Sequence, residues 1–158
     1  WSSDVCSSDL YSGDLQMGST TKRLCDALLN ADNIDSYFDN NADRIDIGVD
    51  LSEFLEEKLK ESGLTRAELF ARSSINPSYG YQLLSGLRSP ARDTAVQLAL
   101  GLSLGVDDTQ KLLRMAKLGA LYPRDRRDSI ILFAISNGFT LPQTNELLFS
   151  HSMNGLSK

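Results

Sequence analysis

The chain has 158 residues, 41% hydrophobic and 23% charged, so it can bury a core, yet no apolar run approaches the roughly 20 residues of a membrane helix. Its formal charge of −5 is uneven, because residues 1–50 carry −7 and residues 51–158 carry +2, which leaves the larger part compatible with nucleic acid. Two cysteines and one histidine, His151, exclude a disulfide framework and most metal sites.

The first sixteen residues differ from the rest of the chain. Ser-Ser-Asp occurs twice in them, and Asp4–Leu10 resembles the translation of a sequencing-library adapter. We expect residues 1–16 to be an artefact or a disordered tail, with Met17 as the natural start, and we exclude them from the fold. Without a secretory pattern, we expect a cytoplasmic protein.

Residues 17–49 are predicted to form an acidic N-terminal arm with one helix. Apolar residues with helical spacing predict that helix over residues 20–29. An aspartate-rich stretch follows, in which residues 33–38 can form a short helical turn. Its charge fits either a solvated linker or a partner-binding arm.

From Asp50 onward the helical pattern becomes regular. Asp50 is a suitable N-cap for a helix that Gly63 ends. Thr65, with Glu68 three residues later, forms a capping box that begins a second helix.

A third helix follows the tight turn at residues 73–75. Asn76 caps it and Pro77 occupies its first position, so it spans residues 77–84. Two further helices, over residues 92–102 and from Asp107 onward, complete a set of five within residues 51–118.

Two extra helices are predicted in a C-terminal extension, residues 119–150. They cover residues 126–136 and the segment that begins at Pro142. The extension either completes the core or serves as a dimerisation or docking element. The basic loop 124–127 could contact phosphate, or it could pair with Asp125 and Asp128 or with the acidic arm. No segment shows strand alternation, so we expect an all-α fold.

The two short helices on either side of residues 73–75 are typical of a helix-turn-helix. Their close crossing requires small residues, a role that Ala71 and Ser74 can fill, and Ile75 can occupy the core between them. The helix over residues 77–84 is then held outward, with its N-terminal end free to enter a major groove.

A longer joint pattern extends through this segment. It reads Leu64-Thr65-Arg66-x-x-Leu69-x-Ala71-x-x-Ser74-Ile75-Asn76-x-x-Tyr79, then Gly86-x-Arg88-x-Pro90 and Leu98-Ala99. The pattern resembles the Cro/Xre, phage-repressor-like family of regulators, which implies a five-helix DNA-binding domain over residues 51–118. Ser74 stands where that family usually has glycine. Gly80 stands where it has a large apolar residue, so Tyr79 or Leu83 must fill the space.

The resemblance also implies a set of DNA-contacting residues. Arg66 can serve phosphate or guanine, and Gln82 can contact adenine through two hydrogen bonds. Tyr81 could meet a sugar or a thymine methyl group, and Arg88 is placed to hold phosphate. The full set is Arg66, Asn76, Pro77, Ser78, Tyr81, Gln82 and Arg88.

We therefore expect a transcriptional regulator that binds duplex DNA, without cofactor or metal, as a possible homodimer through the C-terminal helices. The alternative is an adaptor that kept the fold, lost DNA binding and binds a protein partner. A basic cluster of Arg66, Arg88 and Arg92 would favour DNA, and their dispersal among carboxylates would favour the adaptor. The chain has no phosphate-binding glycine loop or nucleophile–base pair, so we expect no enzyme.

Overall fold

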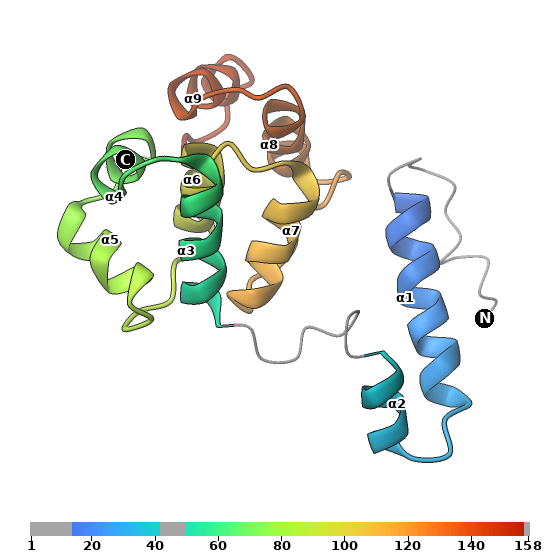
Figure 1. Ribbon diagram of the computed structural model, residues 1–158. Helices are drawn as coiled ribbons and strands as arrows, with labels where there is room; N and C mark the ends of the chain where they lie inside the picture. Colours follow the sequence, from blue (N-terminus) through green and yellow to red (C-terminus); the bar gives the residue numbers. More distant parts are fainter. Residues whose placement is uncertain (1–13, 42–49, 157–158) are drawn as a thin grey trace. The chain divides into compact units, whose positions relative to one another are not determined.

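The computed structural model describes residues 14–41 and 50–156, and its regular structure there is entirely helical, as the sequence predicted. The chain divides into two compact units between residues 47 and 48. Figure 1 labels the helices of each unit. The first unit holds α1 (Asp14–Leu29) and α2 (Ile34–Asn40). The second holds α3 (Leu51–Ser62), α4 (Arg66–Arg72), α5 (Pro77–Leu84), α6 (Arg92–Gly101), α7 (Val106–Met115), α8 (Arg126–Ser136) and α9 (Leu141–Ser150).

The predicted acidic arm contains two helices rather than one. α1 begins at Asp14, earlier than predicted, and α2 extends through the stretch expected to form only a short turn. The side chain of Asn33 caps α2 by accepting a hydrogen bond from the Ser36 N–H at 2.8 Å. The predicted artefact at residues 1–16 lies outside the described residues except for 14–16, as does the end of the arm at residues 42–49.

The caps predicted for α4 and α5 are confirmed, and Asp50 is the N-cap residue of α3 as predicted, although its side chain makes no capping hydrogen bond. Thr65 and Glu68 form the reciprocal capping box of α4, in which hydrogen bonds from the Thr65 backbone N–H and hydroxyl hold the pKa of Glu68 below its usual range. Asn76 caps α5. The carboxylate of Asp50 instead accepts a hydrogen bond from the Ser52 hydroxyl at 2.7 Å.

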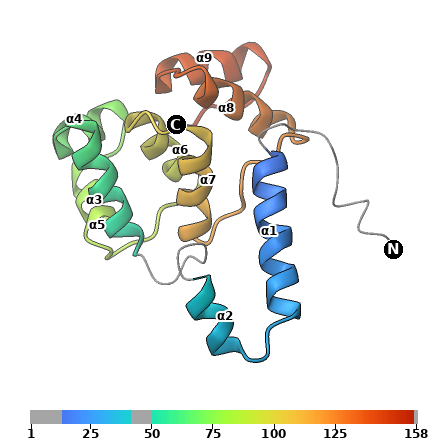
Figure 2. The same ribbon diagram turned by 45° about the vertical axis from the view of Figure 1, so that its right-hand side comes forward.

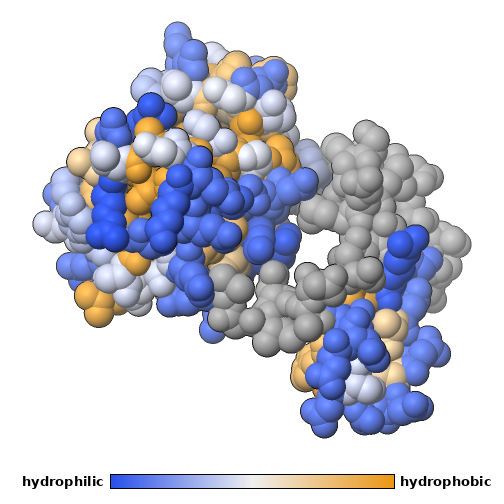
Figure 3. Space-filling view, in the orientation of Figure 1, coloured by the Kyte–Doolittle hydropathy of each residue, from blue (hydrophilic) through white to orange (hydrophobic). Residues whose placement is uncertain are grey.

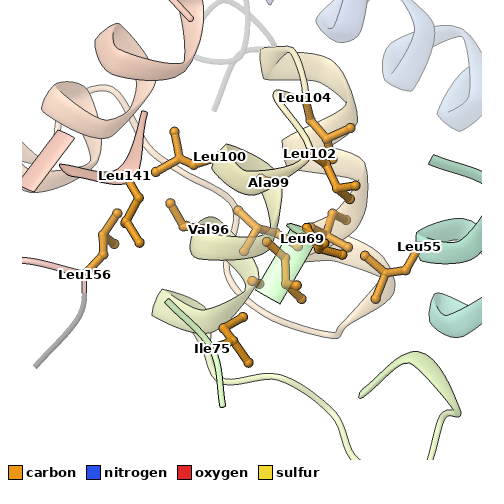
Figure 4. Close-up of a cluster of buried hydrophobic side chains, with 14 of the residues drawn as sticks. Leu55, Leu69, Ile75, Val96, Ala99, Leu100, Leu102, Leu104, Leu141 and Leu156 are labelled. Atoms are coloured by element: carbon orange, nitrogen blue, oxygen red, sulfur yellow. The ribbon is translucent and has the colours of Figure 1, made fainter. Parts of the chain in front are cut away.

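The core of residues 50–156 is built around α6. Seven consecutive residues of this helix, 95–101, are buried, so neighbours cover it on all sides. In Figure 4, Val96 and Leu100 point toward Leu141 and Leu156 from the C-terminal end of the chain. The extension that contains α8 and α9 therefore shares one core with the preceding helices.

Buried polar contacts fix the segment between α7 and α8. Arg92 donates to both carboxylate oxygens of Asp128, at 2.8 and 2.7 Å. Burial alone would raise the pKa of Asp128, but hydrogen bonds from Arg92 and from the Tyr122 N–H outweigh burial and hold that pKa below its usual range. The Gln110 side chain both donates to and accepts from the Leu121 backbone at 2.8 Å.

One of the alternatives predicted for the basic loop, pairing with Asp125 and Asp128, is wrong for Arg127. Arg127 pairs with Asp93 on α6 at 2.9 Å, and not with Asp125 or Asp128. Asp125 instead caps α8 by accepting from the Asp128 N–H. In the part of the chain that the structure describes, no helix is long and apolar enough to cross a bilayer.

Candidate nucleic-acid interface

A tight turn separates α4 from α5 by four residues. Its central residue, Ser74, has a φ of +51°, the left-handed conformation that glycine adopts most easily. The N–H of Ser74 donates to the Ala71 carbonyl at 3.3 Å, and the N–H of Ile75 donates to the Phe70 carbonyl at 3.0 Å. These bonds form a Schellman motif, and its last residue, Ile75, is buried as predicted.

The small residues at the helix crossing are not the predicted ones. Ala71 and Ser74 are exposed, whereas Ser73, Gly80 and Gly101 are buried. A Cβ atom on Gly101 would lie 3.3 Å from the Cβ of Ser73. α6 can therefore approach α4 closely only because this pair is small.

The space beside Gly80 is filled by α4, and the prediction that Tyr79 or Leu83 fills it is wrong. A Cβ atom on Gly80 would overlap the ring of Phe70. That ring packs edge-on against Tyr81, with ring centroids 5.1 Å apart. Gly80 thus allows α5 to lie in direct contact with Phe70, which in turn packs against Tyr81.

α5 carries no charge and exposes a polar and aromatic face. Ser78 and Tyr81 are exposed and Gln82 is half-buried, and their helical spacing places all three on one face. Pro77 is exposed at the first position, and the exposed Asn76 uses its side-chain oxygen to cap the Ser78 N–H at 2.9 Å. α5 lies at the edge of its unit, away from α8 and α9 (Figures 1 and 2).

Three of the predicted residues line one hollow of about 290 Å³. Arg66, Tyr81 and Gln82 share it with four residues that the sequence did not indicate as site residues, Glu56, Leu84, Ser85 and Leu87. The Nη2 atom of Arg66 lies 2.8 Å from the Oε1 atom of Glu56. No local spacing signals this pair, because it joins α3 to α4.

The arginines singled out in the sequence do not form one free basic cluster. Arg66 pairs with Glu56, and Arg92 is held by Asp128. Arg88 is exposed and has no ion pair with any described residue. Figure 3 shows one face of residues 50–156, on which hydrophobic side chains lie in separate patches among hydrophilic ones.

The described residues offer no metal site, and the comparisons with known proteins identify no relative. No group of three or more His, Cys, Asp or Glu side chains suited to a metal occurs within the described ranges 14–41 and 50–156. His151 is exposed at the C-cap of α9. Comparisons of the chain with protein-family models, curated proteins and solved structures find no match.

Proposed function

We propose that residues 51–118 form a repressor-like helix-turn-helix domain that binds duplex DNA in a sequence-specific manner and regulates transcription. In this proposal α4 and α5 are the two helices of the motif, and α5 reads the major groove. The left-handed turn at Ser74 and the close contact of Gly80 with Phe70 support it, because both hold two short helices firmly together.

The observation that carries the proposal is the exposed face of α5, which has neutral hydrogen-bonding side chains and arginines nearby. Base edges are read by neutral amides and hydroxyls as well as by arginine, and phosphates are held by cations. Ser78 and Gln82 supply the neutral groups, and Arg66 and Arg88 supply the cations. The single carboxylate between residues 64 and 91, Glu68, is already engaged in the capping box of α4.

The residues have distinct roles in this proposal. Gln82 contacts an adenine, and Tyr81 contacts a thymine methyl group or a sugar. Asn76, Pro77 and Ser78 form the end of α5 that enters the groove. Arg88 holds a phosphate without reading sequence.

We include a homodimer in the proposal, because a single α5 with two nearby arginines makes few contacts and two half-sites multiply affinity. The extension offers a surface for the second copy. Phe133 on α8 is exposed and contacts Phe139, with ring centroids 6.0 Å apart. Sedimentation of the wild type beside Phe133→Ser tests this point: a dimer that the substitution dissociates supports it, and a wild-type monomer at all concentrations contradicts it.

Selection of duplexes from a random library tests the DNA function. Gln82→Ala should relax the preference at one base position by about 1–3 kcal/mol. Arg88→Ala should weaken binding to all DNA sequences alike. It should also reduce the slope of log K against log salt concentration by about 0.9. Matched controls are Asn154→Ala and Arg114→Ala, which replace exposed residues outside α4, α5 and the basic loop 124–127. If the wild type enriches no motif, the proposed function is wrong.

A protein-binding adaptor that does not bind DNA is a second candidate function, because carboxylates already pair with arginines that DNA binding would use. Two of the three arginines at issue, Arg66 and Arg92, are engaged by carboxylates. Tyr81 and Leu87, which are 50% and 77% exposed, flank the hollow and could receive an apolar side chain of a protein partner. This candidate predicts no salt-dependent binding to any duplex.

A further inference from the structure

A carboxylate lies among the residues that we propose to contact DNA. Glu56 on α3 is 2.8 Å from Arg66, and both side chains line the hollow that contains Tyr81 and Gln82. A carboxylate repels the phosphates of DNA, so its position on such a face needs an explanation.

The pair contributes little to the stability of the fold. The Arg66 side chain is 51% exposed, and an ion pair this accessible to water is weak. Arg66 is also the first residue of α4, where a positive charge opposes the helix dipole. The pair is therefore better suited to biasing the orientation of the guanidinium group than to stabilising the fold.

The ion pair leaves most of the guanidinium free. It involves one terminal nitrogen of Arg66, whereas the group has five N–H donors. With Nη2 held by Glu56, the remaining donors have a restricted orientation, and a guanine contact through two hydrogen bonds requires such a restriction. The same carboxylate disfavours a phosphate that approaches Arg66 at an unrelated sequence.

We propose that Glu56 sets the sequence specificity of this face by positioning Arg66 and by competing with phosphate for the Arg66 guanidinium at non-specific sites. Glu56 is a positioning residue and contacts no base itself. The inference rests on the proposed DNA-binding function.

The test compares the full-length wild type with Glu56→Gln and Glu57→Gln. Glu57 is an exposed residue of the same helix that does not line the hollow, so its substitution changes the charge equally. The measurements are the dissociation constants, over a salt series, for the duplex that the wild type enriches and for an unrelated duplex of equal length. Circular dichroism confirms that both variants are folded.

Glu56→Gln should strengthen binding to the unrelated duplex and steepen its salt slope by about 0.9, because Arg66 becomes free to neutralise one more phosphate. The ratio of specific to non-specific affinity should fall about tenfold, within the range of one lost base contact. Glu57→Gln should change both affinities together and leave the ratio unaltered.

A double variant separates positioning from direct reading. In an Arg66→Ala background, Glu56→Gln should cause no further fall in the ratio, since Glu56 acts through Arg66. A further fall would overturn the positioning role, as would equal behaviour of Glu56→Gln and Glu57→Gln, and both results leave the DNA function intact. If the wild type enriches no duplex, the proposed function fails and this inference fails with it.

Discussion

Gly80→Ala tests whether the contact between α4 and α5 is as close as the structure indicates. In an exposed helix this substitution would stabilise the protein by about 1 kcal/mol. At Gly80 the new methyl group would overlap three ring carbons of Phe70, which is buried and confined by Tyr81. Overpacking of a core costs about 1–3 kcal/mol. With the upper value, the net destabilisation is about 2 kcal/mol.

Urea unfolding followed by circular dichroism measures this change, with Gly119→Ala as the control. A Cβ atom on Gly119 meets nothing within 4 Å, so the control should stay within about 0.5 kcal/mol of the wild type. Phe70→Leu makes room for the methyl group, so the double variant should show a favourable coupling energy of about 0.5–3 kcal/mol. If Gly80→Ala is as stable as the wild type, the reasoning on this contact is refuted.

Three further predictions concern the same unit and the same unfolding assay. Ser74→Gly should stabilise the protein by about 1 kcal/mol, because glycine adopts the left-handed turn without strain; an unchanged midpoint would contradict this. The buried hydroxyl of Ser73 has no hydrogen-bond partner among the described residues, so Ser73→Ala should be neutral or stabilising by about 1 kcal/mol; a loss larger than that would reveal a hidden partner. Asp128→Asn should cost about 1–3 kcal/mol, because Arg92, which is partly exposed, loses its charged partner and keeps only the Gly119 and Ala120 carbonyls. Since folding lowers the pKa of Asp128, its contribution to stability is complete above about pH 4 and disappears as the pH falls through the lower folded-state pKa. Asp128→Asn should flatten that acid dependence, and an unchanged pH profile would contradict the assignment.

The features that the sequence predicted correctly are set by residues close together in the chain. The capping box of α4 and the cap of α5 each involve partners two or three residues apart. α8 spans residues 126–136 as predicted, because Asp125 precedes it and Gly138 follows it with a φ of +67°. Local hydrogen bonding and backbone conformation suffice for such boundaries.

The features that the sequence missed depend on which residues meet across the fold. The sequence predicts Ala71 and Ser74 at the crossing of α4 with α5, but that crossing uses Gly80, and the crossing of α4 with α6 uses Ser73 and Gly101. Adjacent residues of a helix point about 100° apart, so a shift of one or two positions moves a small side chain from the contact to solvent. Helical spacing identifies an apolar face but not the point at which two helices touch.

The pairing of Arg92 with Asp128 links the candidate site to the C-terminal extension. From its sequence position it was a candidate member of a basic DNA-binding surface, but it lies 36 residues from Asp128 in the chain and pairs with it through two hydrogen bonds. α6, which begins at Arg92, packs on α4 at one side and faces Leu141 and Leu156 at another. Removal of α8 and α9 would therefore expose apolar surface of α6 and leave the Arg92 charge without its partner. The extension is thus part of what holds α4 and α5 in position, and the candidate interface belongs to residues 50–156 as a whole.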